Sequence, residues 1–303
     1  MMRLKKIFFL CLTIILVSAL LGCVDQHRKS AGGGAENKNT GEAARLVATS
    51  PAGVAICDRL KLELIGVCDT NGTMPERYKN VTRVGMAMSP DLEVIKSLKP
   101  DYVLSPNSLQ NDLQPKYASI GVSALFLDLR SVDGMYASID ALGDKFGCRA
   151  EADKLIDEYN AFMEEYREKN KGKNSPKVLV LMGLPGSYIV ATDNSYVGSL
   201  VKLAGGTNVY GDGDGKEFLI VNTEDIKTKE PDVIVRAAHG LPEKAREMFA
   251  KEFETNDIWK HFKAVQSGRV YDLDPDVFGM SATFRYPEAL EALESILYAE
   301  DES

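Results

Sequence analysis

The sequence predicts an α/β fold in which two lobes with largely parallel sheets are joined by one long α-helix. Three observations support this prediction. Short apolar runs typical of buried strands alternate with helical patterns through most of the 303-residue chain. An amphipathic stretch without glycine or proline covers residues 149–171, near the middle of the chain. A short motif also recurs once on each side of that stretch, at residues 92–104 and 223–235.

The first residues have the layout of a secretory signal rather than of a structural helix. Arg3, Lys5 and Lys6 precede an apolar run that ends in Leu-Leu-Gly before Cys23. This ending resembles the lipobox of bacterial lipoproteins, in which the cysteine carries diacylglycerol and an acyl chain such as palmitate. We therefore expect a lipoprotein signal peptide over residues 1–22, with Cys23 as the lipidated mature N-terminus. Plain secretion and an uncleaved membrane anchor are the alternatives, and both also place the folded part outside the membrane.

The next segment, residues 23–44, is rich in glycine, asparagine and charge, with almost nothing to bury. It is interpreted as a flexible tether. The folded part then comprises an N-terminal lobe (45–147), a connecting helix (148–172) and a C-terminal lobe (173–303). The expected strands are residues 45–49, 64–67, 101–105, 122–127, 177–182, 232–236 and 269–273.

The connecting helix is predicted from the spacing of its apolar side chains. Between Leu155 and Tyr166 these side chains recur every three or four residues, which is typical of one buried helix face. A charged run follows, and Pro176 precedes the next strand. The helix therefore stands between the strands of the two lobes.

The repeated motif reads "LEVIKSLKPDYVL" in the first lobe and "TEDIKTKEPDVIV" in the second, and the two copies align without a gap. In each copy a glutamate, Glu93 or Glu224, opens a short helix. Pro-Asp then ends the helix, because proline cannot continue it, and a hydrophobic strand follows. A single copy could be a chance turn, but its recurrence in both lobes favours duplication of one unit.

Composition excludes some classes of partner and site. An apolar content of 45% and a charged content of 26% are those of a globular protein. The net charge of −8 argues against binding of nucleic acid, which requires clustered lysine and arginine. No CxxC spacing exists, so a thiolate zinc site is unsupported, and Cys57, Cys68 and Cys148 are interpreted as small buried hydrophobic residues. Whether Cys57 pairs with Cys68 stays open.

An enzyme would be expected to carry a recognisable catalytic or nucleotide-binding motif, and none is present. The chain has no G-x-S-x-G elbow, no P-loop and no G-x-G-x-x-G after its first strand. The segment "GDGDGK" at residues 211–216 lacks the glutamate that a twelve-residue calcium loop requires, so it is interpreted as a surface turn. Catalysis is therefore not expected.

Two residues, one in each lobe, suggest a ligand site. His239, one of three histidines, directly follows a predicted buried strand in "DVIVRAAHGLPE". Met88 lies in "RVGMAMSPDLE", just before the first copy of the repeated motif, so the two residues could face each other across a cleft between the lobes. A thioether and an imidazole together form a known axial pair for haem iron. The alternatives are a hydrogen-bonded structural histidine and, for one of 10 methionines, a core filler.

From Arg45 to the C-terminus, the chain resembles the haem-binding lipoproteins of the iron-regulated surface determinant uptake system. The resemblance rests on long ungapped stretches at residues 184–209, 239–265 and 269–274. These lipoproteins are substrate receptors of ABC importers, with two lobes joined by a backbone helix. Their methionine ligand lies in a G-x-x-M-x-P loop, and their histidine ligand in an H-G-x-P-E segment. The resemblance therefore implies that Met88 and His239 coordinate the iron of one haem b, carried as the transported ligand.

The resemblance also implies contacts to the haem propionates. The corresponding segments are the helix start "TSPAGV" and the loop "CDTNGT", which give Ala52, Gly53, Thr70 and Asn71 as candidates. A helix N-terminus suits an anionic carboxylate, although Pro51 in the first turn has no N–H to donate. Asn71 stands where the family has a tyrosine. An ordinary capped helix and an Asx-type turn are the alternative interpretation of these two segments.

The implied partners are haem, the two ABC permease subunits, the membrane through the lipid anchor, and a haem-donating surface protein. Glu93 and Glu224 resemble the glutamates that dock such receptors onto permease arginines. The expected location is the extracellular face of the bacterial cell membrane. A siderophore or corrinoid receptor of the same fold is the main alternative, although Arg236 and Arg285 are too few to bind an anionic siderophore. A zinc or manganese receptor would need more histidine and carboxylate ligands.

Overall fold

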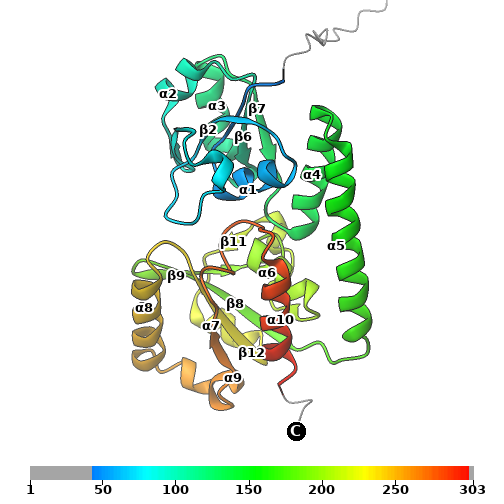
Figure 1. The fold of residues 1–303 in the computed structure, drawn as a ribbon. Coiled ribbons are helices and arrows are strands. Elements are labelled where there is room, and N and C mark those ends of the chain that lie inside the picture. Colours follow the sequence, from blue (N-terminus) through cyan, green and yellow to red (C-terminus); the bar gives the residue numbers. More distant parts are fainter. Residues whose placement is uncertain (1–42, 300–303) are drawn as a thin grey trace, which may run out of the picture. The chain divides into compact units, whose positions relative to one another are not determined.

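Two main sheets carry the fold of the computed structural model (Figure 1). The structure describes residues 43–299, and these lie within one compact unit. The predicted signal peptide, Cys23 and nearly all of the predicted tether lie outside the described residues. Among residues 43–299, no helix is both long and apolar enough to cross a membrane. The residue limits proposed for the two lobes and the connecting helix remain predictions.

The first sheet is entirely parallel, with the strand order β3-β2-β1-β6-β7. Its strands are β1 (Leu46–Ala48), β2 (Leu64–Val67), β3 (Thr82–Arg83), β6 (Tyr102–Pro106) and β7 (Ala124–Leu127). The helices that follow its strands are α1 (Pro51–Arg59), α2 (Leu92–Leu98) and α3 (Gln110–Ser119), with 3-10 turns at η1 (Glu76–Tyr78) and η2 (Asn107–Leu109). Because all strands run the same way, their carboxyl ends meet at one edge of the sheet.

The second sheet has the strand order β11-β9-β8-β12-β13, and a short strand, β10, also pairs with β8. Its strands are β8 (Lys177–Leu184), β9 (Ser187–Ala191), β10 (Thr207–Asn208), β11 (Phe218–Leu219), β12 (Val233–Ala238) and β13 (Val270–Asp272). The helical segments of this part are α6 (Tyr196–Leu203), η3 (Gly213–Gly215), α7 (Thr223–Thr228), α8 (Pro242–Thr255), η4 (Trp259–His261), α9 (Lys263–Gln266) and α10 (Tyr286–Leu297). Strand β9 runs antiparallel to its neighbours β8 and β11, whereas β8, β10, β12 and β13 pair with one another in parallel. The predicted α/β class with largely parallel sheets is therefore confirmed.

The predicted long helix is present as α5 (Arg149–Lys169), which packs beside α4 (Val132–Phe146) (Figure 1). Tyr159 of α5 is buried and stacks on Tyr136 of α4 with ring centroids 4.2 Å apart. Farther along α5, the hydroxyl of Tyr166 donates a hydrogen bond to the carbonyl of Leu290 in α10, at 3.1 Å. The apolar face of α5 thus contacts elements that accompany both sheets.

Both copies of the repeated motif fold as a helix, a stop and a strand. The side chains of Asp91 and Asn222, which are aligned, cap the N-termini of α2 and α7 by accepting backbone N–H bonds. The aligned residues Lys99 and Glu230 both have φ of 49°, a left-handed conformation that ends each helix before the proline. Glu93 and Glu224 each occupy the second position of their helix.

The aspartate of each Pro-Asp pair also plays the same role in both copies. The Asp101 Oδ2 atom accepts a hydrogen bond of 2.7 Å from the backbone N–H of Arg45, just before β1. The Asp232 Oδ2 atom accepts one of 3.0 Å from the backbone N–H of Lys177, at the start of β8. Each aspartate therefore joins the start of the strand that follows it, β6 or β12, to the start of the first strand of its sheet, β1 or β8. This shared detail supports duplication of one unit.

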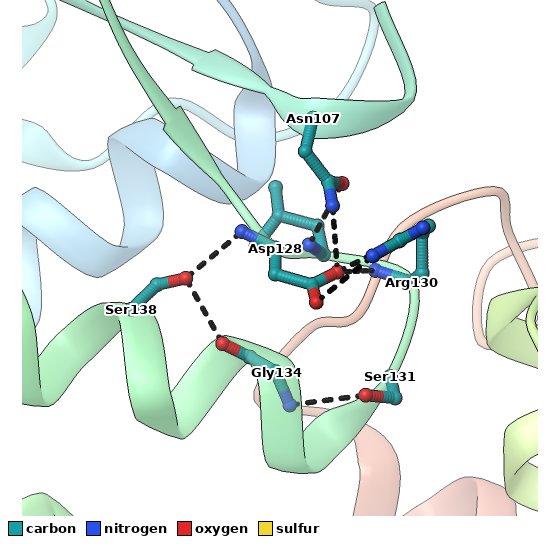
Figure 2. A network of polar contacts seen from close by, with 7 residues as sticks. Asn107, Asp128, Arg130, Ser131, Gly134 and Ser138 are labelled. Carbon is teal, nitrogen blue, oxygen red and sulfur yellow. Dashed lines mark hydrogen bonds and ion pairs between the residues drawn. The ribbon is translucent and has the colours of Figure 1, made fainter. Parts of the chain in front are cut away.

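A polar network holds the segment that leads from β7 into α4 (Figure 2). The Asp128 carboxylate accepts hydrogen bonds from Asn107 at 2.8 Å and from the guanidinium of Arg130 at 3.0 and 3.2 Å. The backbone N–H of Asp128 donates to Ser138 of α4 at 2.9 Å, and Ser131 caps that helix. Partial burial opposes ionisation of Asp128, but the hydrogen bonds from Arg130 and Asn107 outweigh it and lower its pKa. The chain therefore leaves the first sheet in a fixed direction.

Candidate functional site

Three chain segments that carry candidate residues lie side by side at the carboxyl edge of the first sheet. Helix α1 follows β1, the loop of residues 68–75 follows β2, and residues 84–90 follow β3, and these strands are adjacent and parallel. The backbone N–H of Asp69 donates to the carbonyl of Gly85 at 2.8 Å, which ties the second segment to the third. Ligands of open α/β sheets bind at this edge, so the position is appropriate for a binding site.

The start of α1 is capped by Ser50, and Pro51 is the first helical residue. The Ser50 hydroxyl accepts the N–H of Gly53 at 3.1 Å, and the Ser50 carbonyl accepts the N–H of Val54 at 2.9 Å. The N–H of Gly53 is therefore already used by Ser50. A direct contact between this N–H and a propionate would require it to be free. In the described part of the chain we find no acceptor for the N–H of Ala52, which leaves it available to an anion.

The loop after β2 forms a turn, but Asn71 does not make it. The Thr70 hydroxyl accepts the backbone N–H of Gly72 at 3.0 Å, so the turn depends on threonine rather than on an Asx motif. The turn that the alternative interpretation expected is therefore present, but with a threonine in place of an Asx residue. Asn71 itself is exposed, and Thr70 is half-buried.

Met88 lies in the turn of a tight hairpin, whose two short strands were not among those expected from the sequence. Strands β4 (Gly85–Met86) and β5 (Ser89–Pro90) pair antiparallel, and Ala87 and Met88 form the two-residue connection. Gly85 has φ of 83°, a backbone conformation that favours glycine. At the base of the hairpin, the backbone N–H of Asp91 donates a hydrogen bond to the carbonyl of Val84 at 2.8 Å. The Met88 side chain is 68% exposed, so its sulfur is accessible to a ligand.

His239 directly follows β12, at the carboxyl edge of the second sheet. Its backbone N–H donates to the carbonyl of Gly183 at 2.9 Å, which extends the β8–β12 ladder by one residue. Within residues 43–299 we find no hydrogen bond of its imidazole, and the side chain is exposed. The surrounding protein nevertheless desolvates the ring and lowers the pKa of His239. This shift favours the neutral imidazole, the form that binds a metal, and the structural alternative lacks the hydrogen bond that it requires.

The structure thus brings five of the six predicted haem-contacting residues to one edge of the first sheet. These residues are Ala52, Gly53, Thr70, Asn71 and Met88. His239 belongs to the second sheet, and within residues 43–299 it makes no hydrogen bond or ring contact with the other five. The two predicted docking residues, Glu93 and Glu224, are exposed on α2 and α7.

Exposed apolar side chains accompany both predicted ligands, and the sequence analysis did not single them out. Met86 is 65% exposed in the same hairpin as Met88, and Leu241 is 51% exposed two residues after His239. Large exposed apolar side chains that cluster at one place indicate a binding surface. The repeated methionine in "GMAM" was the available signal for the first of them.

Other features of the described chain do not compete with this site. Two surface hollows of about 300 and 470 Å³ lie beside α4 and α8, and none of the predicted ligand residues lines either of them. Among residues 43–299 there is also no cluster of three or more histidine, cysteine, aspartate or glutamate side chains able to hold a bare metal ion.

Three comparisons with known proteins show what the whole chain is similar to. The chain is 41% identical to the high-affinity heme uptake system protein IsdE of Staphylococcus aureus (strain Newman) over 288 residues, which cover 95% of this chain and 97% of that protein. It is similar to the crystal structure of an ABC transporter substrate-binding protein from Listeria monocytogenes EGD-e, with 45% identity, a TM-score of 0.81, and coverage of 86% of this chain and 100% of that one. It is also similar to the crystal structure of S. aureus IsdE complexed with heme, with 43% identity, a TM-score of 0.80, and coverage of 85% and 100%.

These similarities confirm the fold class and the resemblance that the sequence indicated. They also confirm the prediction of a binding protein for transport rather than an enzyme, because the relatives are proteins of that kind. A family model described as periplasmic binding protein matches residues 46–277, which is most of the chain. The chain therefore belongs to the periplasmic binding protein family.

Proposed function

We propose that this protein is the substrate receptor of an ABC haem importer and that it binds one haem with Met88 and His239 as axial ligands. One observation carries the proposal. An exposed thioether and an exposed imidazole stand at the carboxyl edges of the two largely parallel sheets, where ligands of such sheets bind. The similarity to IsdE over 95% of the chain supports haem as the ligand.

The chemistry of the donor set fits a haem. A neutral nitrogen and a neutral sulfur are ligands that both suit haem iron, and neither adds charge to an apolar site. The porphyrin faces are apolar, and exposed Met86 and Leu241 supply apolar surface beside the two ligands. The free N–H of Ala52 at the start of α1 would donate a hydrogen bond to a propionate carboxylate, with Thr70 and Asn71 in the adjacent loop.

The proposed partners follow from the same function. Glu93 and Glu224 occupy equivalent positions in equivalent helices, and each carboxylate is exposed. A pair of such acids, one beside each sheet, would dock onto basic side chains of two permease subunits. Lipidation at Cys23 would hold the receptor at the extracellular face of the cell membrane, where it would receive haem b from a haem-donating surface protein.

Separate titrations with three ligands test the proposed function against the siderophore and corrinoid alternatives. The purified chain without its signal peptide would be titrated with haemin, ferric desferrioxamine and cobalamin, each followed by its visible absorption. We expect one equivalent of haemin to bind with the sharp spectrum of six-coordinate, low-spin iron, and the other two ligands to leave the protein unchanged. Saturable binding of ferric desferrioxamine or cobalamin, with no specific haemin spectrum, would refute the proposal.

A further inference from the structure

We infer that Met86 is a second thioether ligand for the haem iron, able to replace Met88 in the axial position. This inference rests on the proposed function and deepens it. In the family motif matched by residues 85–90 only the later methionine is a ligand, so Met86 has no assigned role. The hairpin would then offer the iron two exchangeable sulfur atoms.

The first observation is where the exposed methionines lie. Among residues 43–299, Met86 and Met88 are the two methionines whose side chains are exposed, at 65% and 68%. The remaining methionines of this part of the chain are buried or half-buried, namely Met74, Met135, Met163, Met182, Met248 and Met280. Leaving an apolar side chain in water forgoes the stabilisation of burying it. Two such residues, two positions apart, therefore indicate a surface that is covered when the ligand binds.

The second observation is the geometry of the hairpin. Met86 pairs with Ser89 across the two strands, and Met88 is the second of the two connecting residues. Two residues separated by two positions have Cα atoms at most about 7 Å apart. A methionine side chain has three rotatable bonds, so either sulfur can approach a common iron atom without a change of backbone.

The backbone of the hairpin is itself constrained. A Cβ atom at Gly85 would come within 3.0 Å of both the Ser89 carbonyl oxygen and the Asp91 nitrogen, so the base of the hairpin is closely packed. The backbone N–H of Asp69 donates to the carbonyl of Gly85, and that of Asp91 donates to the carbonyl of Val84, each at 2.8 Å. Exchange of the sulfur ligand would therefore involve side-chain rotation alone.

The exchange is chemically balanced. One iron–sulfur bond breaks and another forms between the same metal and the same type of neutral thioether. Neither a proton nor an electron is transferred, and the charge of the site is unchanged. The imidazole of His239 would remain bound throughout, so that the haem is never released by the exchange.

The test compares three variants loaded with haemin: Met88→Ala, Met86→Leu, and the double variant with both changes. Leucine keeps the apolar volume of Met86 and removes only the sulfur, which separates ligation from packing. We expect Met88→Ala to retain a six-coordinate, low-spin spectrum with the charge-transfer band of iron–thioether ligation. The double variant should lose that band, and Met86→Leu alone should resemble the unchanged protein.

A Met88→Ala spectrum identical to that of the double variant would overturn the inference, because Met86 would then make no bond to iron. Loss of the band in Met86→Leu alone would also overturn it, because Met86 would then be the primary ligand. Far-ultraviolet circular dichroism would verify that all three variants are folded. Failure of the unchanged protein to bind haemin would instead refute the proposed function, so the two failures are distinguishable.

Discussion

The imidazole of His239 is the side chain on which the proposed haem site depends most. It follows a buried strand, it is exposed, and it has no hydrogen-bond partner within residues 43–299. We expect His239→Ala to convert the low-spin haemin spectrum to a high-spin one and to weaken haemin binding by about tenfold or more. Imidazole binds ferric iron better than a thioether does, so this change should exceed the effect of Met88→Ala. Visible spectra and haemin titrations measure both effects.

His261 provides a matched control for this substitution. It is exposed at the end of the 3-10 turn η4, which follows helix α8. His261→Ala should leave both the spectrum and the affinity unchanged. Equal behaviour of the two variants would remove His239 from the site.

Haemin affinity should depend on pH through His239. Desolvation lowers the pKa of this group, so its protonated form is disfavoured. The nitrogen lone pair of His239 therefore remains available to iron at a lower pH than the lone pair of an ordinary histidine does. As pH falls through that lowered pKa, protons compete with iron for the nitrogen and the affinity drops. The decline should therefore begin below about 6.5, the usual histidine value. Titrations in a pH series measure it, and a decline already complete above that value would contradict the assignment.

At the scale of elements, the β4–β5 hairpin should be more important for haem binding than for folding. Gly85 has φ of 83°, and a Cβ atom there would contact Ser89 and Asp91 at 3.0 Å. We expect Gly85→Ala to destabilise the fold by about 1–2 kcal/mol and also to weaken haemin binding, because it displaces the methionines. Gly121 has a similar φ of 74° with no atom within 4 Å of an added Cβ. Gly121→Ala should lower the melting temperature without altering haemin affinity.

The equivalent helices α2 and α7 give a second prediction at this scale. Reversing both exposed acids, Glu93→Arg with Glu224→Arg, should leave haemin affinity nearly unchanged and strongly reduce haem-dependent growth of cells that rely on this receptor. Exposed charges act mainly through encounter and orientation, so single changes should be milder and sensitive to salt. A control with the same change of charge is Glu164→Arg with Glu254→Arg, at exposed sites in α5 and α8. Normal growth with the Glu93 and Glu224 double variant would show that neither glutamate is needed for docking and that both only stabilise the starts of their helices.

For the whole molecule, we expect only a small movement on haem binding. Helix α5 has no internal breaker, and Tyr159 packs against Tyr136 of α4 and Tyr286 of α10 with ring centroids 4.2 and 5.6 Å apart. The backbone N–H of Ala282 also donates to the carbonyl of Leu129 at 2.7 Å. Small-angle scattering of free and haem-loaded protein should give nearly the same radius of gyration. A large compaction would show that these contacts break.

The sequence was sufficient for elements with strong patterns and insufficient for those without one. The strand beginning at Lys177 was found because its apolar run is long, and α5 was found because its apolar spacing persists over 21 residues. The hairpin around Met88 was missed because its strands contain two residues each, too few to show a period. Whether a side chain such as His239 is exposed depends on tertiary packing, so no local pattern could reveal it.

The crystal structure of the haemin complex would test the central proposal most directly. It should contain one porphyrin whose iron is bonded to the His239 imidazole and to the Met88 thioether, with a propionate at the start of α1. Anomalous scattering at the iron edge would locate the metal independently of the porphyrin density. An iron atom bound away from His239, or bound by His239 with no methionine of the hairpin in its coordination sphere, would contradict the proposal.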